Sequence, residues 1–384
     1  MDLLLHPTIV NTELSHYYKR AFKNAIELFV VTAYLTEWEA KLELNPECRS
    51  FRVIIGRNFG ITRKAACEKV MRWLPPKRKA QFMVADQIGG FHPKAVFWKE
   101  MTGKCFAIVG SSNLTQAAFK SNYEANVVFR LPEADYVKGK KWVRKIEAQS
   151  VVVSEAWLKQ YKEAPLRSQH RINGPDGPDQ DAAPVVVFKL PAPSRMGELI
   201  AKRRRYLAAY KKKQAGLMRL FRRCANNEIT SQQFYNELPR YWSAKAADRL
   251  QGRGWERQGS DSDFQALSQS FLRIVNATDE DRDDVVASEI DWLREKKVPT
   301  RGAFLSEMLC LRFPELYPVL NQPVQNYLRA VQFQAPRGAS EGSCFIHLAK
   351  TLRSSLRQNP GHPTKNLAEL DTVIWLVYGK KKAG

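Results

Sequence analysis

The chain has few cysteines and histidines, and neither kind of residue occurs in the spacing that holds a metal ion. There is no Cys-x-x-Cys pair, no His-x-x-x-His pair and no cluster that combines the two residue types. The sequence therefore predicts free thiols in a reducing compartment, and a site without a metal or another cofactor. The six cysteines are Cys48, Cys67, Cys105, Cys224, Cys310 and Cys344, and the six histidines are His6, His16, His92, His170, His347 and His362.

The chain also has no long apolar run, and no leader sequence is expected. The longest uninterrupted apolar run is LFVVTAYL at 28–35, whereas a membrane-spanning helix needs about 20 such residues. The first residues, MDLLLHP, have neither a basic region nor a long apolar segment, so no signal peptide is expected. No Walker A sequence is present, and GRNFG at 56–60 lacks the spacing of a dinucleotide-binding fingerprint. These absences indicate a cytoplasmic protein that has no membrane partner and no phosphate-binding loop.

Acidic residues are too few to balance the basic ones. The sequence has 61 Lys and Arg against 39 Asp and Glu, which gives a formal net charge of +22. Such an excess favours a polyanionic partner and fast, salt-sensitive association with it. Charge alone does not distinguish nucleic acid from a ribosome or a membrane surface.

The most informative stretch is HPKAVFWKEMTGKCFAIVGSSNLTQAAFKSNYE at 92–124. His92 and Lys94 are two residues apart on a predicted strand, so their side chains share a face of that strand. The turn Gly-Ser-Ser-Asn, ending at Asn113, follows a second predicted strand, and Glu124 comes immediately before a third. We therefore expect an imidazole, an ammonium, an amide and a carboxylate to meet where the strands end.

These groups suit the cleavage of a phosphodiester without a metal ion. A neutral imidazole at His92 can attack phosphorus, and an imidazolium can protonate the leaving oxygen, because histidine titrates near neutrality. Lys94 offers positive charge, and Asn113 offers hydrogen-bond donors, to the non-bridging oxygens. Glu124 would hold the second ring nitrogen of the imidazole and so fix its orientation. Ser111, in the turn before Asn113, is the fifth candidate catalytic residue.

Each of these residues has an ordinary structural interpretation when it is taken singly. A lone histidine is usually a satisfied core residue, and Glu124 alone would be a surface charge. Ser111 and Ser112 would be turn formers after a strand, since Gly, Ser and Asn dominate turns. The three blocks in this order and spacing favour a catalytic site instead.

Over roughly residues 1–160 the chain resembles the phospholipase D superfamily, also called the HKD family. The resemblance is carried by His92-Pro93-Lys94, by Gly110-Ser111-Ser112-Asn113 and by the acid at Glu124. The similar members are single-motif nucleases, including metal-independent restriction endonucleases and defence-associated nucleases. The chain departs from the family pattern at Lys99, where the family has Asp, and this departure weighs more against a lipase than against a nuclease.

The resemblance also implies an oligomeric state, because the reaction needs two histidines and the sequence has no second His-x-Lys. Single-motif members form a homodimer in which a composite site on the two-fold axis brings His92 beside its symmetry mate. The expected function is that of a metal-independent phosphodiesterase with a phosphohistidine intermediate. A DNA endonuclease of restriction or antiviral defence type is favoured, with a defence-system partner protein compatible with it. Two alternatives stay open: a lipid phosphodiesterase, and an inactive nucleic-acid-binding or scaffold protein.

Strands and helices alternate over 1–161, which predicts an α/β N-terminal domain with a phospholipase D-like mixed sheet flanked by helices. Expected strands are LFVVTAYL, FRVIIGR, QFMVAD, KAVFW, CFAIVG and ANVVFR, and expected helices cover 12–27, 62–74 and most of 133–161. A capping-box pattern at 36–39 predicts a further helix start.

The rest of the chain is expected to be mainly α-helical. A Pro/Gly-rich linker at 162–194 contains VVVFKL (185–190), which is compatible with an edge strand. A basic helical segment follows at 195–229, and a helical domain for recognition or partner binding at 230–384. The basic segment is interpreted as a helix along a phosphate backbone, with a solvated helix face as the alternative. Its candidate nucleic-acid-binding residues are Lys202, Arg203, Arg204, Arg205, Lys211, Lys212, Lys213 and Arg219.

Overall fold

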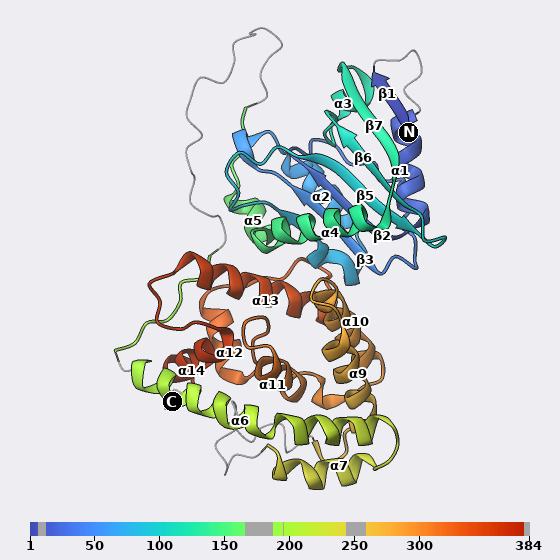
Figure 1. Cartoon of the computed structure of the whole chain (residues 1–384). Helices are drawn as coiled ribbons and strands as arrows, with labels where there is room; N and C mark the ends of the chain where they lie inside the picture. The colour runs from blue at the N-terminus through green and yellow to red at the C-terminus, as the bar shows by residue number, and fades with distance from the viewer. Residues whose placement is uncertain (7–12, 166–186, 195, 243–258, 380–384) are drawn as a thin grey trace. The chain divides into compact units, whose positions relative to one another are not determined.

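The computed structural model describes the chain except for residues 7–12, 166–186, 195, 243–258 and 380–384 (Figure 1). It divides into two compact units, of which unit 1 comprises 1–186 with 336–339, and unit 2 comprises 187–335 with 340–384. The predicted fold class is confirmed, because a mixed sheet flanked by helices is followed by a mainly helical region.

Unit 1 is built on one sheet, whose eight described strands lie in the order β1-β7-β6-β5-β2-β3-β4-β8. β2 pairs in parallel with β3, and β3 with β4, while every other neighbouring pair is antiparallel. The strands are β1 (Asp2–His6), β2 (Ala25–Thr32), β3 (Ser50–Ile55), β4 (Phe82–Val84), β5 (Lys94–Glu100), β6 (Cys105–Gly110), β7 (Glu124–Leu131) and β8 (Val151–Val152).

Helices cover both faces of this sheet, so its central strands are buried on both sides and are apolar almost without interruption. On one face, Val30 and Val53 pack in a core that includes Phe22 of α1 (Glu13–Asn24). On the other face, Phe29 packs with Val143 of α4 (Glu133–Ala148). The remaining helices of unit 1 are α2 (Lys64–Trp73), α3 (Gln116–Lys120) and α5 (Glu155–Gln160), with 3-10 turns at Asn58–Gly60 and Pro76–Gln81.

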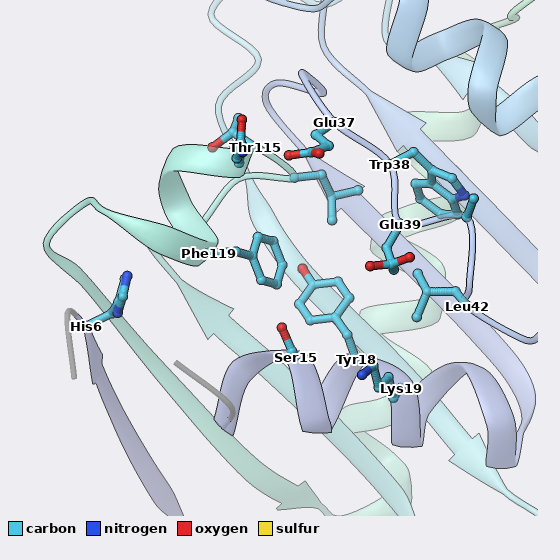
Figure 2. A pocket seen from close by; sticks show the side chains of 13 residues that line it. His6, Ser15, Tyr18, Lys19, Glu37, Trp38, Glu39, Leu42, Thr115 and Phe119 are labelled. Carbon is cyan, nitrogen blue, oxygen red and sulfur yellow. The ribbon is translucent and has the colours of Figure 1, made fainter. Parts of the chain in front are cut away.

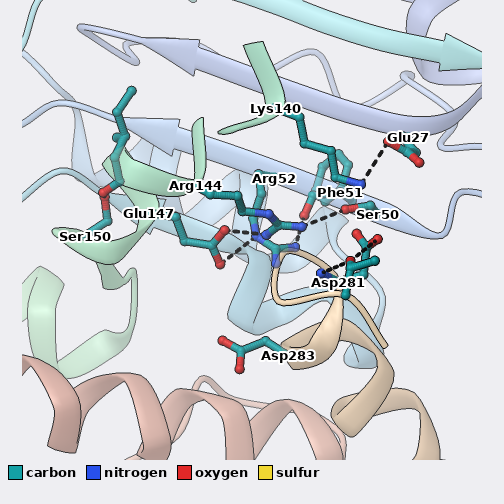
Figure 3. A network of polar contacts seen from close by, with 12 residues as sticks. Glu27, Ser50, Phe51, Arg52, Lys140, Arg144, Glu147, Ser150, Asp281 and Asp283 are labelled. Atoms are coloured by element: carbon teal, nitrogen blue, oxygen red, sulfur yellow. Dashed lines mark hydrogen bonds and ion pairs between the residues drawn. The ribbon is translucent and has the colours of Figure 1, made fainter. Parts of the chain in front are cut away.

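A buried charge network joins β3 to α4 (Figure 3). The Arg52 side chain is fully buried, and its Nε lies 2.8 Å from Glu147 Oε1. Arg144 pairs with the same carboxylate and donates to Ser50 Oγ at 3.0 Å. Two guanidinium groups therefore share one carboxylate on the side of the sheet that α4 covers.

The helix predicted to begin at 36–39 is absent, and this prediction was wrong. The segment instead runs beside the chain that follows β6: Leu35 forms a bridge with Leu114, and Thr36 N donates to Leu114 O at 2.9 Å. Trp38 is buried and packs edge-on against Phe22. A capping-box pattern reflects only neighbouring residues in the sequence. Here the backbone N–H of Thr36 donates instead to Leu114, which is distant in the sequence.

Unit 2 is helical in its described part. Its helices are α6 (Met196–Ala225), α7 (Ser231–Glu237), α9 (Phe264–Asn276), α10 (Arg282–Glu295), α11 (Ala303–Arg312), α12 (Gln322–Ala330), α13 (Glu341–Gln358) and α14 (Leu367–Tyr378), with 3-10 turns at Leu238–Arg240 and Pro299–Arg301. Among the described helices of the chain, none combines the length and apolar character needed to cross a bilayer.

Most of the predicted linker, and residue 195 of the basic segment, lie outside the described residues. The last part of the linker, 187–194, is irregular, so the edge strand expected from VVVFKL is not formed at 187–190. Phe188 instead packs against the rings of Tyr327 and Phe333, and its N–H donates to Ser355 Oγ at 3.0 Å. The apolar run is therefore a core segment of unit 2.

Candidate active site

The structure places His92 and Lys94 in direct contact. Lys94 is the first residue of β5 and lies opposite Thr32 of β2, whereas His92 comes two residues earlier, outside the strand that was expected to carry both. Lys94 Nζ lies 2.9 Å from Nδ1 and 3.2 Å from Nε2 of the imidazole, and donates to the His92 carbonyl at 3.1 Å. The ring of Tyr34 meets the imidazole edge-on at 5.7 Å. One ammonium thus faces both ring nitrogens.

This contact changes the proton affinity of both groups. Partial burial lowers the pKa of His92, and the neighbouring Lys94 charge lowers it further. Burial also lowers the pKa of Lys94, although the Glu124 carboxylate acts in the opposite direction. The neutral imidazole, which is the nucleophilic form, is therefore favoured near neutral pH.

Asn113 is held with its amide nitrogen available. Its Oδ1 accepts from Thr32 Oγ1 at 3.2 Å and from Tyr34 N at 3.1 Å. Nδ2 has no hydrogen-bond partner among the residues that the structure describes, so it can donate to a ligand. The end of β2 therefore fixes both Lys94, through the strand register, and Asn113, through its side chain.

Ser111 and Glu124 form a hydrogen-bonded pair at the facing ends of β6 and β7. Ser111 Oγ donates to Glu124 Oε2 and accepts from Ala125 N at 3.0 Å, while Asn122 Nδ2 donates to Glu124 Oε1 at 3.1 Å. Within the described part of a single chain, Glu124 makes no hydrogen bond to His92. The carboxylate therefore acts on the site through the charge of Lys94, and Ser111 positions it.

The sequence did not single out Asn126, which locks the turn between Ser111 and Asn113. Asn126 is buried on β7; its Nδ2 donates to Ser112 Oγ at 2.8 Å, and its Oδ1 accepts from Ser112 N at 3.3 Å. A Cβ on Gly110 would come within 2.3 Å of Asn126 Oδ1, so only glycine fits there. The signal was a polar residue among the apolar residues that begin the expected strand ANVVFR.

Lys99, which stands where the HKD pattern has Asp, does not take part in this site. It lies five residues along β5 from Lys94, about 17 Å away, and an odd number of residues places it on the other face of the sheet. Its ammonium lies 2.8 Å from Glu133 Oε1 of α4. Among the described residues, Lys99 therefore makes no hydrogen bond or ion pair with His92.

Comparisons with known proteins do not assign this chain to a family. No family model matches it, and no curated protein matches it. Among solved structures it is similar to NucT from Helicobacter pylori, with a TM-score of 0.30 and 14% identity over 40% of this chain and 98% of that one. A similarity of this size carries no argument, so the function is argued from the site itself.

In the described part of the chain, no three His, Cys, Asp or Glu side chains are grouped to hold a metal ion.

The candidate nucleic-acid-binding residues all lie on α6, but they do not share one environment. Arg203 is buried and its NH2 group lies 2.9 Å from Asp371 Oδ2 of α14, and Arg204 pairs with Glu369 at 2.8 Å. Lys213 is half-buried. The exposed ones are Lys202, Arg204, Arg205, Lys211, Lys212 and Arg219. Arg203 is therefore committed to the interior of unit 2, and the exposed residues remain candidates for phosphate contacts.

Replacing Lys94 with methionine is expected to raise the pKa of His92, because one cause of its lowered pKa, the adjacent positive charge, is removed. A proton NMR titration of the His92 ring would measure this, with the resonance assigned by its absence in a His92→Ala spectrum. In the wild-type protein the ring should lose its proton below the ordinary histidine range, and in Lys94→Met at a higher pH. Lys99→Met, the same substitution at the far end of β5, should leave the titration unchanged. A lower or equal pKa in Lys94→Met would contradict the electrostatic account.

Proposed function

We propose that unit 1 is a metal-independent phosphodiesterase that cleaves nucleic acid, with DNA as the favoured substrate. The observation that carries the proposal is the contact of Lys94 Nζ with the His92 imidazole at 2.9 Å, beside an amide donor at Asn113 that β2 holds in place. A neutral nucleophile, a fixed positive charge and a fixed donor are the groups that phosphoryl transfer requires.

In the proposed reaction, a His92 ring nitrogen attacks phosphorus and forms a P–N bond, while the P–O bond to the leaving group breaks. A second imidazolium donates its proton to the leaving oxygen and then, as the free base, removes a proton from water. That water attacks the phosphohistidine, and breaking the P–N bond restores His92. Lys94 and Asn113 stabilise the charge on the non-bridging oxygens throughout.

The second imidazole is proposed to come from another copy of the chain. Among the described residues, no other histidine forms a hydrogen bond or a ring contact with His92. A homodimer with a two-fold axis beside His92 would supply it, since such an interface places each residue opposite its own mate. The fit to single-motif HKD nucleases supports this arrangement, and it is the basis for proposing restriction or antiviral defence as the biological role. Unit 2 would then recognise the target or a defence-system partner protein.

The test of this function is cleavage of plasmid and single-stranded DNA by the purified protein in excess EDTA. We expect cleavage to persist, because no step uses a metal ion. Hydrolysis of phosphatidylcholine liposomes without DNA cleavage would favour the lipid phosphodiesterase. Tight, salt-dependent DNA binding without cleavage under any condition would favour the inactive binding protein.

We also propose that the exposed basic residues of α6 contact the phosphate backbone. Each phosphate contact contributes about 0.9 to the slope of log affinity against log salt concentration. Reversing two exposed charges, Lys211→Glu with Lys212→Glu, should therefore reduce that slope by about two and weaken binding to all DNA sequences alike. The control is Lys296→Glu with Lys297→Glu, the same charge change at exposed positions elsewhere in unit 2. Equal slopes for the two double variants would refute contact by α6.

A further inference from the structure

A cavity of about 640 Å³ lies next to the candidate active site, between α1, α3 and the segment that follows β2 (Figure 2). Two of its walls continue directly from the site. Leu114 and Thr115 follow Asn113 in the chain, and Glu37 comes three residues after Tyr34, which meets the His92 ring. Thr36 N donates to Leu114 O at 2.9 Å and so ties the two walls together. Leu114, the first wall residue, is therefore adjacent to Asn113 in the chain, and their Cα atoms are about 3.8 Å apart.

The cavity has the size and the aromatic surface for a planar ring. Small-molecule sites typically measure about 300–1,000 Å³. The rings of Tyr18 and Phe119 meet edge-on at 5.4 Å, and Trp38 forms part of the wall. Figure 2 shows Phe119 and the hydroxyl of Tyr18 pointing into the space. A flat, apolar face of this kind is what a nucleobase stacks on.

The polar groups of the cavity determine which ring it accepts. Glu37 and Glu39 line it, and the Glu37 carboxylate has no hydrogen-bond partner among the described residues. One carboxylate oxygen of Glu39, Oε1, accepts a hydrogen bond from Lys41 N at 2.9 Å. The lining also includes Lys19 and His6. The two carboxylates accept hydrogen bonds from N–H groups. Burial raises the pKa of Tyr18, so its hydroxyl stays a neutral donor and acceptor at physiological pH.

We infer that this cavity takes one unstacked nucleobase next to the scissile phosphate and selects a base that carries an exocyclic amino group. Guanine fits best, because its N1–H and N2–H₂ groups are adjacent donors that one carboxylate can accept together. Thymine has a single N–H between two carbonyl acceptors and fits poorly. The inference rests on the proposed function, which supplies the nucleic acid, and it adds single-stranded or flipped-out DNA as the form of substrate that is bound.

The experiment measures guanosine and thymidine binding to the full-length protein by saturation-transfer NMR, in the wild type and in His92→Ala. This separates the cavity from the chemistry, because nucleoside binding does not need the nucleophile. We expect guanosine to bind both proteins and to bind more tightly than thymidine. Glu37→Gln, which keeps the shape of the side chain, should weaken guanosine binding roughly 10-fold and leave thymidine unchanged. Phe119→Ala should weaken binding of both nucleosides.

The same variants connect the cavity to catalysis. On single-stranded oligonucleotides that differ at one base beside the cleaved bond, the wild type should prefer guanine over thymine, and Glu37→Gln should lose the preference. Hydrolysis of bis(p-nitrophenyl) phosphate, which has no base, should be the same in both proteins. If the wild type cleaves neither DNA nor this ester, the proposed function fails. If it hydrolyses the ester but binds guanosine no better than thymidine, or binds it equally well in Glu37→Gln, the cavity inference fails.

Discussion

Substitution of His92 by alanine should lower kcat/KM for DNA cleavage in EDTA by at least about 1,000-fold while DNA binding stays within about twofold. In the proposed mechanism the imidazole is the nucleophile and, on the second protomer, the general acid, so the variant would lose both functions at once. Binding should persist because the exposed cations of α6 are untouched. Gel electrophoresis of plasmid cleavage and fluorescence anisotropy of a labelled duplex measure the two quantities.

The matched control for this substitution is His16→Ala, because His16 is exposed on α1 and makes no contact with His92 among the described residues. It should cleave DNA as the wild type does. A pure His92→Ala preparation that cut DNA at the wild-type rate would eliminate the mechanism. Loss of both binding and cleavage would instead contradict the assignment of DNA binding to the exposed cations of α6.

Glu147→Ala should destabilise unit 1 by about 3–5 kcal/mol, the usual cost of removing one partner of a buried ion pair. Its carboxylate lies 2.8 Å from Nε of Arg52, whose side chain is fully buried, and also pairs with Arg144. Without it, two guanidinium groups lie below the sheet with much less compensation of their charge. Urea unfolding followed by hydrogen exchange of the β3 amides would report on this unit separately from unit 2.

Two comparisons distinguish charge from packing in this prediction. Glu133→Ala removes the exposed partner of Lys99 and should change stability little, because solvent screens such a pair. The triple variant Arg52→Met, Arg144→Met and Glu147→Leu removes all three charges of the network and should recover much of the loss, since apolar side chains of similar volume replace the ion pairs. An unchanged midpoint for Glu147→Ala would show that the network does not stabilise the fold.

The contact between His92 and Lys94 could be predicted from sequence because the two residues are close in the chain. His92 and Lys94 are two residues apart and do meet, but His92 lies before β5, so the contact is made across the start of the strand and not by the expected alternation along it. The partners that hold the site could not be predicted in the same way. Asn113 is fixed by Thr32 and Tyr34, about 80 residues earlier in the chain, and such pairings become visible only when β2 lies beside β5.

The burial of Arg203 in the basic helix α6 also could not be predicted from the sequence. Arg203 lies seven residues before Tyr210, and therefore on the stripe of α6 that faces the interior. A charged residue in an apolar stripe needs a buried counter-charge, and here it is Asp371, 168 residues away. Composition predicted a basic helix, but it could not distinguish the one cation that points inward from those that face solvent. The central strands were predicted because they are continuously apolar, whereas β1 and β8 are short edge strands and were missed.

Thr32, at the end of β2, positions both Lys94 and Asn113. This arrangement affects which parts of the sequence can vary during evolution. Lys94 and Asn113 are both registered on Thr32, which is buried, whereas Glu37, Glu39 and Phe119 belong to a loop and a short helix outside the strands. The proposed reacting groups and the proposed base-selecting groups thus reside on separate structural elements. We expect descendants of this sequence to vary in the segments 36–42 and 116–122 and so to change what is selected, while the reacting groups keep their places.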